Sequence, residues 1–177
     1  AGTTTDAIEG LRAMVDTTSP TTYGGISGTD FSWWRATKDT ATTAMSIAKL
    51  QAGYGDVTID GDKPNIAVTT QNLFDKYMNL LQPQQRFSDP GTANAGFQNL
   101  LFRGVPVLVD SHCPANYWLF LNEKYIKFFY HPDENFRMEP FRKPINQAVA
   151  VAQIFWWGNI GSSNRRMNMV FTGLSET

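Results

Sequence analysis

The sequence predicts an α+β fold, with helices in the first part of the chain and strands in the second. After Gly96 the apolar residues form short runs separated by turn residues, which is typical of strands. Residues 149–173 are long enough for two strands and predict a long C-terminal β-hairpin, with its turn at residues 158–164. Residues 71–81 predict a helix because one face carries Leu73, Phe74, Tyr77, Met78 and Leu81.

Two adjacent tryptophans, Trp156 and Trp157, stand inside this closing run. Successive side chains of a strand point to opposite faces, so adjacent tryptophans require cover on both faces. A small domain usually leaves one face of its sheet to solvent. Either the strand is buried on both faces within its own domain, or a neighbouring chain covers one of them.

The composition of the 177 residues is that of one globular domain, or of two small interleaved ones. Aromatic residues make up 13%, a high share that favours large buried areas and interfaces. The net charge of −1 argues against a dedicated binder of nucleic acid or membrane surfaces, and no apolar stretch reaches the length of a membrane span. The single cysteine forms no internal disulfide, which fits an intracellular, reducing origin.

Three helices are expected in the first half of the chain. The first spans residues 6–16, which open on a capping pattern. The second spans about residues 39–52, and Gly53 is its natural stop. The third is the segment 71–81, which Pro83 ends.

Short strands separated by turns account for most of the remaining chain. Residues 17–32 and 88–96 are expected to be loops because they are rich in Gly, Ser and Thr, and the His-Pro-Asp-Glu run at 131–134 is expected to break a strand. The expected strands are residues 65–68, 100–102, 105–109, 117–121 and 125–130, with residues 136–141 extended.

One cluster of catalytic residue types stands out: Asp110, His112 and Cys113. A cysteine nucleophile requires a base that lowers the pKa of its thiol. His112 and Cys113 are adjacent in a turn before Pro114, and adjacent residues rarely place their side chains for proton transfer. We therefore expect a loop capped by Asp110 with a small buried thiol, and no catalytic residue.

Other motifs point to turns rather than to sites. Residues 24–28 lack the preceding strand and the following Lys-Ser/Thr of a phosphate-binding loop, and their glycines indicate positive φ angles. The carboxylate pairs Asp60/Asp62 and Asp133/Glu134 also stand at turns, where acids are usually solvated. One cysteine and two histidines are too few for a zinc site. We expect no metal and no cofactor.

Basic residues gather in the last quarter of the chain, interleaved with aromatic residues. Such a cluster is compatible with a nucleic-acid surface. Because the whole chain is not basic, charged strand edges or salt bridges to a neighbouring subunit are favoured instead. The residues are Arg137, Arg142, Lys143, Arg165 and Arg166.

Several ordered blocks of the sequence resemble the C-terminal half of tailed-bacteriophage major capsid proteins. Residues 100–114 and 117–136 are similar to a strand leading to a phrase like F-x-G-V-P-V, an acidic turn, and a strand ending in L-N-x-K-Y. Residues 147–173 resemble the paired strand with aromatics and the polar turn with Asn-Arg that follow in the family. Tyr-Gly-Gly-Ile at 23–26 and Trp-Trp-Arg at 33–35 resemble the same family. The order and spacing of these blocks, over nearly the whole chain, make the match specific.

This resemblance implies the Hong Kong 97-type capsid fold, a mixed sheet flanked by helices plus a long C-terminal β-hairpin packed with the N-terminal helices. Residues 1–63 and 141–177 would form a discontinuous peripheral domain, and residues 64–140 an axial domain that points at the capsomer centre. Nothing in the sequence resembles the N-terminal arm or the extended loop of such proteins, and the chain opens on Ala1 rather than Met. We therefore expect a C-terminal fragment.

The function that the resemblance implies is structural: a major capsid (head) subunit of a bacteriophage or prophage that self-assembles into the shell enclosing phage DNA. The implied partners are copies of itself in pentamers, hexamers and the shell, scaffolding and portal proteins, and packaged DNA through non-specific contacts, with no membrane. The implied location is the virion, after assembly in the bacterial cytoplasm. We expect no enzymatic activity. Subunit contacts are expected at Trp33, Trp34, Arg142, Lys143, Trp156, Trp157, Arg165 and Arg166.

Three alternatives remain open at this stage. A capsid-like protein nanocompartment would share the fold and enclose cargo proteins instead of a genome. A small cysteine-dependent enzyme would use Cys113, and a nucleic-acid-binding module would use the C-terminal arginines.

Overall fold

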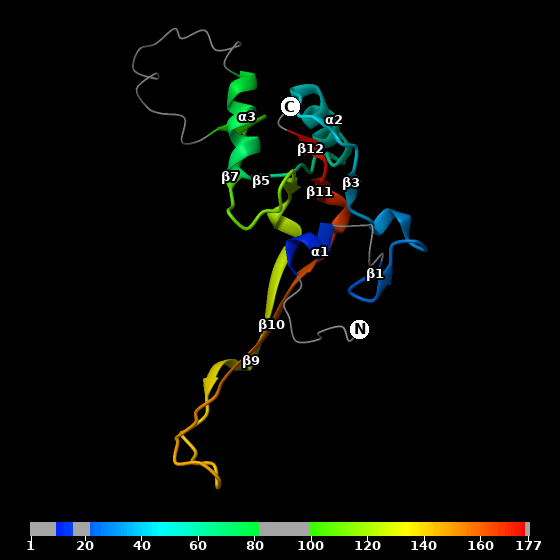
Figure 1. Cartoon of the computed structure of the whole chain (residues 1–177). Coiled ribbons are helices and arrows are strands. Elements are labelled where there is room, and N and C mark those ends of the chain that lie inside the picture. The colour runs from blue at the N-terminus through cyan, green and yellow to red at the C-terminus, as the bar shows by residue number, and fades with distance from the viewer. Residues whose placement is uncertain (1–9, 16–21, 82–99, 176–177) are drawn as a thin grey trace.

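The computed structural model describes residues 10–15, 22–81 and 100–175 (Figure 1). A six-stranded mixed sheet forms its body. In spatial order the strands are β3 (Thr37–Asp39), β11 (Met169–Phe171), β8 (Trp118–Leu121), β5 (Ile66–Thr69), β7 (Val105–Val109) and β6 (Leu101–Phe102). The pairs β3–β11 and β5–β7 are parallel, and the other neighbouring pairs are antiparallel.

The β8 strand shows why both faces of this sheet are covered. Its Trp-Leu-Phe-Leu run is apolar at every position, and all four side chains are buried. Because side chains alternate along a strand, a strand without a polar face needs cover from both sides. Trp118 and Phe120 belong to one core cluster, and Leu119 and Leu121 belong to a second.

Two helices pack on the cluster that contains Trp118. They are α2 (Ile47–Asp56) and α3 (Gln71–Leu81), and each buries a tyrosine there, Tyr54 and Tyr77. The helix predicted at residues 71–81 is confirmed. No helix within the described residues is long and apolar enough to span a membrane.

The second cluster is covered by elements near the N-terminus. The short helix α1 (Leu11–Val15) lies within the helix expected at 6–16, whose residues 6–9 and 16 fall outside the described ranges. Beside it, β1 (Thr22–Tyr23) and β2 (Ile26–Ser27) form a small hairpin. Its two turn glycines, Gly24 and Gly25, take the positive φ angles that the sequence indicated, 58° and 77°, whereas Gly28 does not.

The remaining short elements connect the body. Strands β4 (Thr43–Ala44) and β12 (Leu174–Ser175) form a parallel pair. Three 3₁₀ helices complete the described chain: η1 (Ser32–Trp34), η3 (Glu123–Tyr125) and η4 (Arg165–Met167).

A long two-stranded ladder runs away from the body (Figure 1). It pairs β9 (Ile126–Met138) with β10 (Ile154–Ser162), from Ser162 opposite Ile126 to Ile154 opposite Met138. We call residues 126–162 the arm. Tyr130 pairs with Gly158 and Asn135 with Trp156, so residues 131–134 lie opposite Trp157 alone as a bulge.

A long β-hairpin is present, but it is not the one expected within residues 149–173, because β10 pairs with the earlier strand β9 and β11 joins the body sheet. The turn expected at residues 158–164 is wrong, because residues 158–162 belong to β10. The connection between the two long strands is residues 139–153. The break expected at residues 131–134 is the bulge, and β9 continues beyond it.

The second helix also differs from the expectation. Residues 37–39 and 43–44 are strands, and the helix begins only after Ser46, whose hydroxyl accepts the backbone N–H of Lys49. Gly53 does not end this helix but lies inside it. A Cβ at Gly53 would sit 2.6 Å from Cε of Met169, so the glycine permits close packing of α2 on β11. The loop expected at 88–96 and Pro83 lie outside the described residues.

Candidate assembly interface

The base of the arm is fixed to the body by polar contacts. Tyr125, just before β9, donates its hydroxyl to Asp62, and the ammonium of Lys124 pairs with the same carboxylate at 2.9 Å. The Tyr125 hydrogen bond, and then Lys124, hold the pKa of Asp62 below its usual value. On β10, the carbonyl oxygen of Ile160 accepts the hydroxyl of Tyr23 at 2.9 Å. The arm therefore leaves the body in a defined direction.

One face of the arm is an open aromatic groove. The rings of Trp156 and Phe128 are stacked, with centroids 5.6 Å apart, and Phe136 is tilted against the same indole at 6.3 Å. Together with Tyr130 and Asn135 these residues line a groove of about 580 Å³. Phe128 and Phe136 remain 56% and 71% exposed, so no part of the chain that the structure describes fills the groove.

The opposite face of the arm is also aromatic. Trp157 is 63% exposed and Phe129 is 58% exposed. Phe129 lies over a glycine of the neighbouring strand, since a Cβ at Gly161 would approach its ring to 2.9 Å. Because Trp156 and Trp157 alternate along β10, the two faces each carry one of the adjacent tryptophans.

The connection between the two strands extends the apolar surface. Exposed apolar side chains follow one another there, at Phe141, Ile145, Val149 and Val151. Large exposed apolar patches usually mark a protein or membrane contact.

Two arginines of the arm are paired with acids of the arm itself. The guanidinium of Arg137 lies 2.8 Å from Glu134 and 3.6 Å from Glu139, and Arg142 lies 3.8 Å from Glu139. Lys143 is exposed. The cluster seen in the sequence is therefore not a single basic surface, and salt bridges within the chain account for part of it.

Two of the residues expected at subunit contacts lie buried inside the body. Trp34 and Arg165 are only 8% and 1% exposed. Arg165 donates its Nε–H to the carbonyl oxygen of Met14 at 2.6 Å and lies 4.8 Å from the ring centroid of Tyr23. These contacts span most of the chain, so local sequence pattern could not reveal them. The other six keep surface: Trp33, Arg142, Lys143, Trp156, Trp157 and Arg166.

The Asp110/His112/Cys113 cluster does not form an activated nucleophile. The His112 side chain is 93% exposed and lies 3.4 Å from the Asp110 carboxylate. The thiol of Cys113 instead points its S–H at the carbonyl oxygen of Tyr117, 3.8 Å away. Burial, and then the charge of Asp110, raise the pKa of Cys113 to about 11. A reactive cysteine needs the opposite shift.

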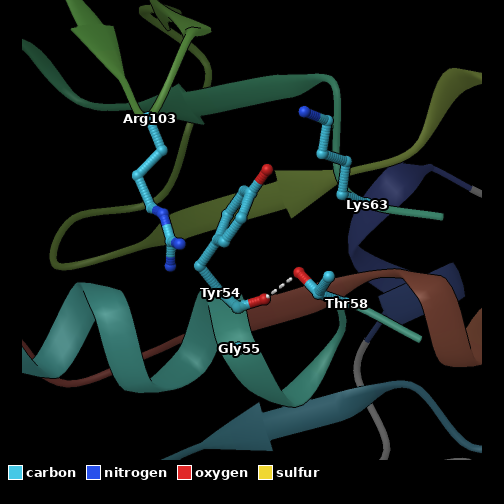
Figure 2. Close-up of a pocket in the computed structure, with 5 residues that line it drawn as sticks. All are labelled: Tyr54, Gly55, Thr58, Lys63 and Arg103. Atoms are coloured by element: carbon cyan, nitrogen blue, oxygen red, sulfur yellow. Dashed lines mark hydrogen bonds between the residues drawn. The ribbon is translucent and has the colours of Figure 1, made fainter. Parts of the chain in front are cut away.

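A cavity of about 420 Å³ opens beside the last turn of α2 (Figure 2). Figure 2 shows Arg103 and Lys63 on either side of Tyr54, and the guanidinium carbon of Arg103 lies 5.1 Å from the Tyr54 ring centroid. Burial raises the pKa of Tyr54, and Arg103 opposes that shift. Since Tyr54 also packs edge-on against Phe102 and Phe120, Arg103 covers the rim of the aromatic core.

The sequence analysis missed the aromatic residues of β9 as contact candidates. The signal was present, because Phe128, Phe129 and Tyr130 are consecutive and an alternating strand cannot turn all three toward one core. The alternation that requires cover on both faces at Trp156 and Trp157 also requires it on the partner strand β9.

Comparison with known proteins yields structural matches alone, since no family model and no curated protein matches the chain. The capsid asymmetric unit of cyanophage A-1(L) matches with a TM-score of 0.71 and 17% identity, covering 94% of this chain and 60% of that one. The holo-SrpI encapsulin complex of Synechococcus elongatus PCC 7942 matches with a TM-score of 0.56 and 11% identity, covering 80% of this chain and 54% of that one.

These likenesses establish the fold. The Hong Kong 97-type capsid fold expected from the sequence blocks is confirmed, with its mixed sheet and flanking helices. The chain spans less than two thirds of the length of either matched protein.

Proposed function

We propose that this chain is part of a major capsid subunit that self-assembles into the shell enclosing phage DNA. The observation that carries the proposal is the arm, which exposes aromatic side chains on both faces although its base is fixed to the body. The fold it shares with a phage capsid protein supports the same conclusion.

The energetics of the arm favour a second copy of the protein as its cover. Fully burying one large apolar side chain is worth about 1.5–3 kcal/mol, and Phe128, Phe129, Phe136 and Trp157 are all more than half exposed. In a closed symmetric shell every copy repeats the same contact, so modest individual interfaces add up. Arg137 and Arg142 pair with Glu134 and Glu139 within the arm, which limits repulsion between crowded copies.

We further propose the two-part organisation, with residues 1–63 and 141–177 peripheral and residues 64–140 axial. The arm draws β9 from the axial range and most of its connection and β10 from the peripheral range. The body sheet likewise takes β3 and β11 from the peripheral ranges, so the two parts would share this sheet. Scaffolding and portal partners, virion location and assembly in the bacterial cytoplasm belong to the same proposal.

Electron microscopy of the full-length protein tests the proposal. The wild-type protein should form shells or rings, and Phe129→Ser/Trp157→Ser should give soluble subunits with the wild-type circular dichroism spectrum. Leu101→Ser/Leu108→Ser removes two similarly exposed apolar side chains from the body and serves as the matched control, which should still assemble. The proposal is contradicted if the wild-type protein never assembles, or if the arm variant assembles normally.

A protein nanocompartment is the second candidate, because the encapsulin match supports it on the same fold. The two functions differ in what the shell encloses. Purified shells that protect DNA from nuclease support the capsid function, whereas shells that hold a co-purifying protein and no DNA support the nanocompartment.

An enzymatic role for this chain is not part of the proposal. The group that such a role would use, the thiol of Cys113, has its pKa raised rather than lowered, and His112 is turned toward Asp110 and solvent. A shell subunit requires no catalytic group.

A further inference from the structure

A polar cavity of about 470 Å³ lies on the body, where the segments that precede β3 and β11 meet. The backbone N–H of Thr37 donates to the carbonyl oxygen of Asn168 at 3.1 Å, so the two segments are joined directly. This junction brings Arg35 and Arg166 to one place, although they are far apart in the sequence. The polar and aromatic lining of the cavity is Ser32, Trp33, Arg35, Lys38, Asp56 and Arg166.

The cavity carries an excess of positive charge. Arg35, Lys38 and Arg166 line it, and Asp56 is the single carboxylate among the described residues of the lining. Both arginines are exposed, and neither forms an ion pair with another described residue. Because the whole chain carries a net charge of −1, this excess is local, and the cavity favours an acidic occupant.

One acid of the arm lacks an ion pair of its own. Glu134 and Glu139 are both engaged by Arg137, whereas the exposed Asp133 forms no ion pair within the described ranges. Asp133 stands in the bulge at residues 131–134, where its backbone N–H donates to Nδ1 of His131 at 3.2 Å. The bulge therefore presents a carboxylate that the arm itself does not neutralise.

The cavity and the bulge each stand beside an exposed indole. Trp33, which lines the cavity, is 61% exposed, and its ring lies edge-on to the buried Trp34 at 6.3 Å. Trp157, which lies opposite the bulge on β10, is 63% exposed. Tryptophan and arginine are the residues most enriched among the strong contacts of protein interfaces. The two surfaces therefore match in charge and in apolar character.

From this complementarity we propose that the bulge of one copy docks in the cavity of the next copy. Asp133 of the incoming arm lies between Arg35 and Arg166, because guanidinium groups bind a carboxylate in a fork. Trp157 of the same arm packs against Trp33 at the rim of the cavity. The arm runs away from its own body, so the bulge meets the cavity of a neighbour and not that of its own chain (Figure 1).

The bulge and the cavity are different parts of the chain, so the contact between copies is head-to-tail. Each copy offers one bulge and one cavity, and contacts of this kind close into a ring when the rotation between copies allows it. The inference rests on the proposed function in taking a second copy as the partner. It deepens that function by naming the two surfaces that meet and the direction of the contact.

Sedimentation velocity of the full chain over a series of protein concentrations tests the pairing. Arg35→Gln/Arg166→Gln disables the cavity, and Asp133→Asn disables the bulge. Each variant alone should self-associate about tenfold or more weakly than the wild type, because a charge at the contact is left unpaired. Where each variant alone is monomeric, a one-to-one mixture should form dimers that do not grow, since the first variant keeps its bulge and the second keeps its cavity.

Two further variants separate this contact from a general effect of charge or of folding. Arg35→Glu/Arg166→Glu/Asp133→Arg exchanges the charges of the two surfaces within one chain and should restore self-association. Lys63→Gln/Lys76→Gln removes two cations elsewhere on the body and should associate like the wild type.

Three results would overturn the inference: a mixture that stays monomeric, an exchanged variant that does not recover, or a loss in the control equal to that of the cavity variant. A loss in the cavity variant alone, with Asp133→Asn associating normally, would also overturn it, because the cavity would then take a different acidic segment. If the wild type forms shells but the mixture forms no dimers, this inference alone is wrong. If the dimers form but shells never do, the proposed function alone is wrong.

Discussion

The indole of Trp156 is stacked on the ring of Phe128 across the β9–β10 ladder, with the two planes only 19° apart. The next residue along β10, Trp157, points to the other face and is 63% exposed. The two adjacent tryptophans therefore differ: Trp156 is partly covered by the partner strand, and Trp157 is exposed.

The stack predicts a measurable coupling between Phe128 and Trp156. Phe128→Ala and Trp156→Ala should destabilise the chain by less in combination than the sum of the single changes, with a coupling of about 0.5–1.5 kcal/mol from urea unfolding. Phe128→Ala with Trp157→Ala is the matched control on the opposite face. That pair should be additive within about 0.3–0.5 kcal/mol, and the same coupling in both pairs would contradict the stack.

Two glycines of α2 predict opposite effects of the same substitution. A Cβ at Gly53 would meet the ring of Phe171 and the side chain of Met169, whereas nothing lies within 4 Å of a Cβ at Gly55. Gly55→Ala should stabilise the chain by about 0.5–1 kcal/mol because alanine favours the helix. Gly53→Ala should destabilise it by about 1–3 kcal/mol because the core is overpacked. Urea unfolding measures both, and a stabilising Gly53→Ala would show that α2 packs more loosely.

Gly53 also marks the limit of what local sequence could predict. A glycine after an apolar run was interpreted as a helix stop, yet its role is set by β11, more than a hundred residues later. The true helix start, Ser46, was missed because the preceding Ala and Thr residues fit a helix as well as strands. Where a segment has one unambiguous stripe, as in residues 71–81, the prediction is confirmed at both ends.

In the candidate interface, too, the local features could be predicted from the sequence and the long-range contacts could not. Trp156 and Trp157 alone predict that both faces of their strand need cover, because alternation is a local property of a strand. They do not predict which strand pairs with β10, since its pairing with β9 spans a 15-residue connection. Arg165 and Arg166 are adjacent and of one type, yet one is buried and the other exposed, which depends on where η4 meets α1.

The raised pKa of Cys113 predicts an unreactive thiol. At pH 8 a thiol of pKa about 11 is ionised in about one molecule in a thousand, against about one in four for an ordinary cysteine. The rate of alkylation by iodoacetamide should therefore keep rising beyond pH 10 in the folded chain. In urea-unfolded chain the same rate should level off near pH 9, which provides the control.

The sign of this shift also fixes its effect on stability. The folded chain holds the Cys113 proton after the unfolded chain has lost it, so this contribution is complete below about pH 8.5 and is lost as the pH rises toward 11. Cys113→Ala should flatten the stability profile in that window. A folded-state alkylation rate that levels off below pH 8 would instead reopen the cysteine-enzyme hypothesis.

Arg165 and Arg166 predict the sharpest contrast between neighbouring positions. Arg165→Gln removes a charged donor 2.6 Å from the carbonyl oxygen of Met14 and its contact with the Tyr23 ring, all inside the core. The cost should be about 1.5–3 kcal/mol, the range for a hydrogen bond to a charged group. Arg166→Gln, on the exposed side of η4, should stay within about 0.5 kcal/mol of the wild type. Unfolding in guanidinium chloride measures both changes, provided that the dependence of the unfolding free energy on denaturant concentration is the same in each variant. Arg165→Lys keeps the charge but loses the planar donor geometry, so it should recover little of the loss. An Arg165→Gln variant as stable as Arg166→Gln would show that the contact between η4 and α1 contributes little.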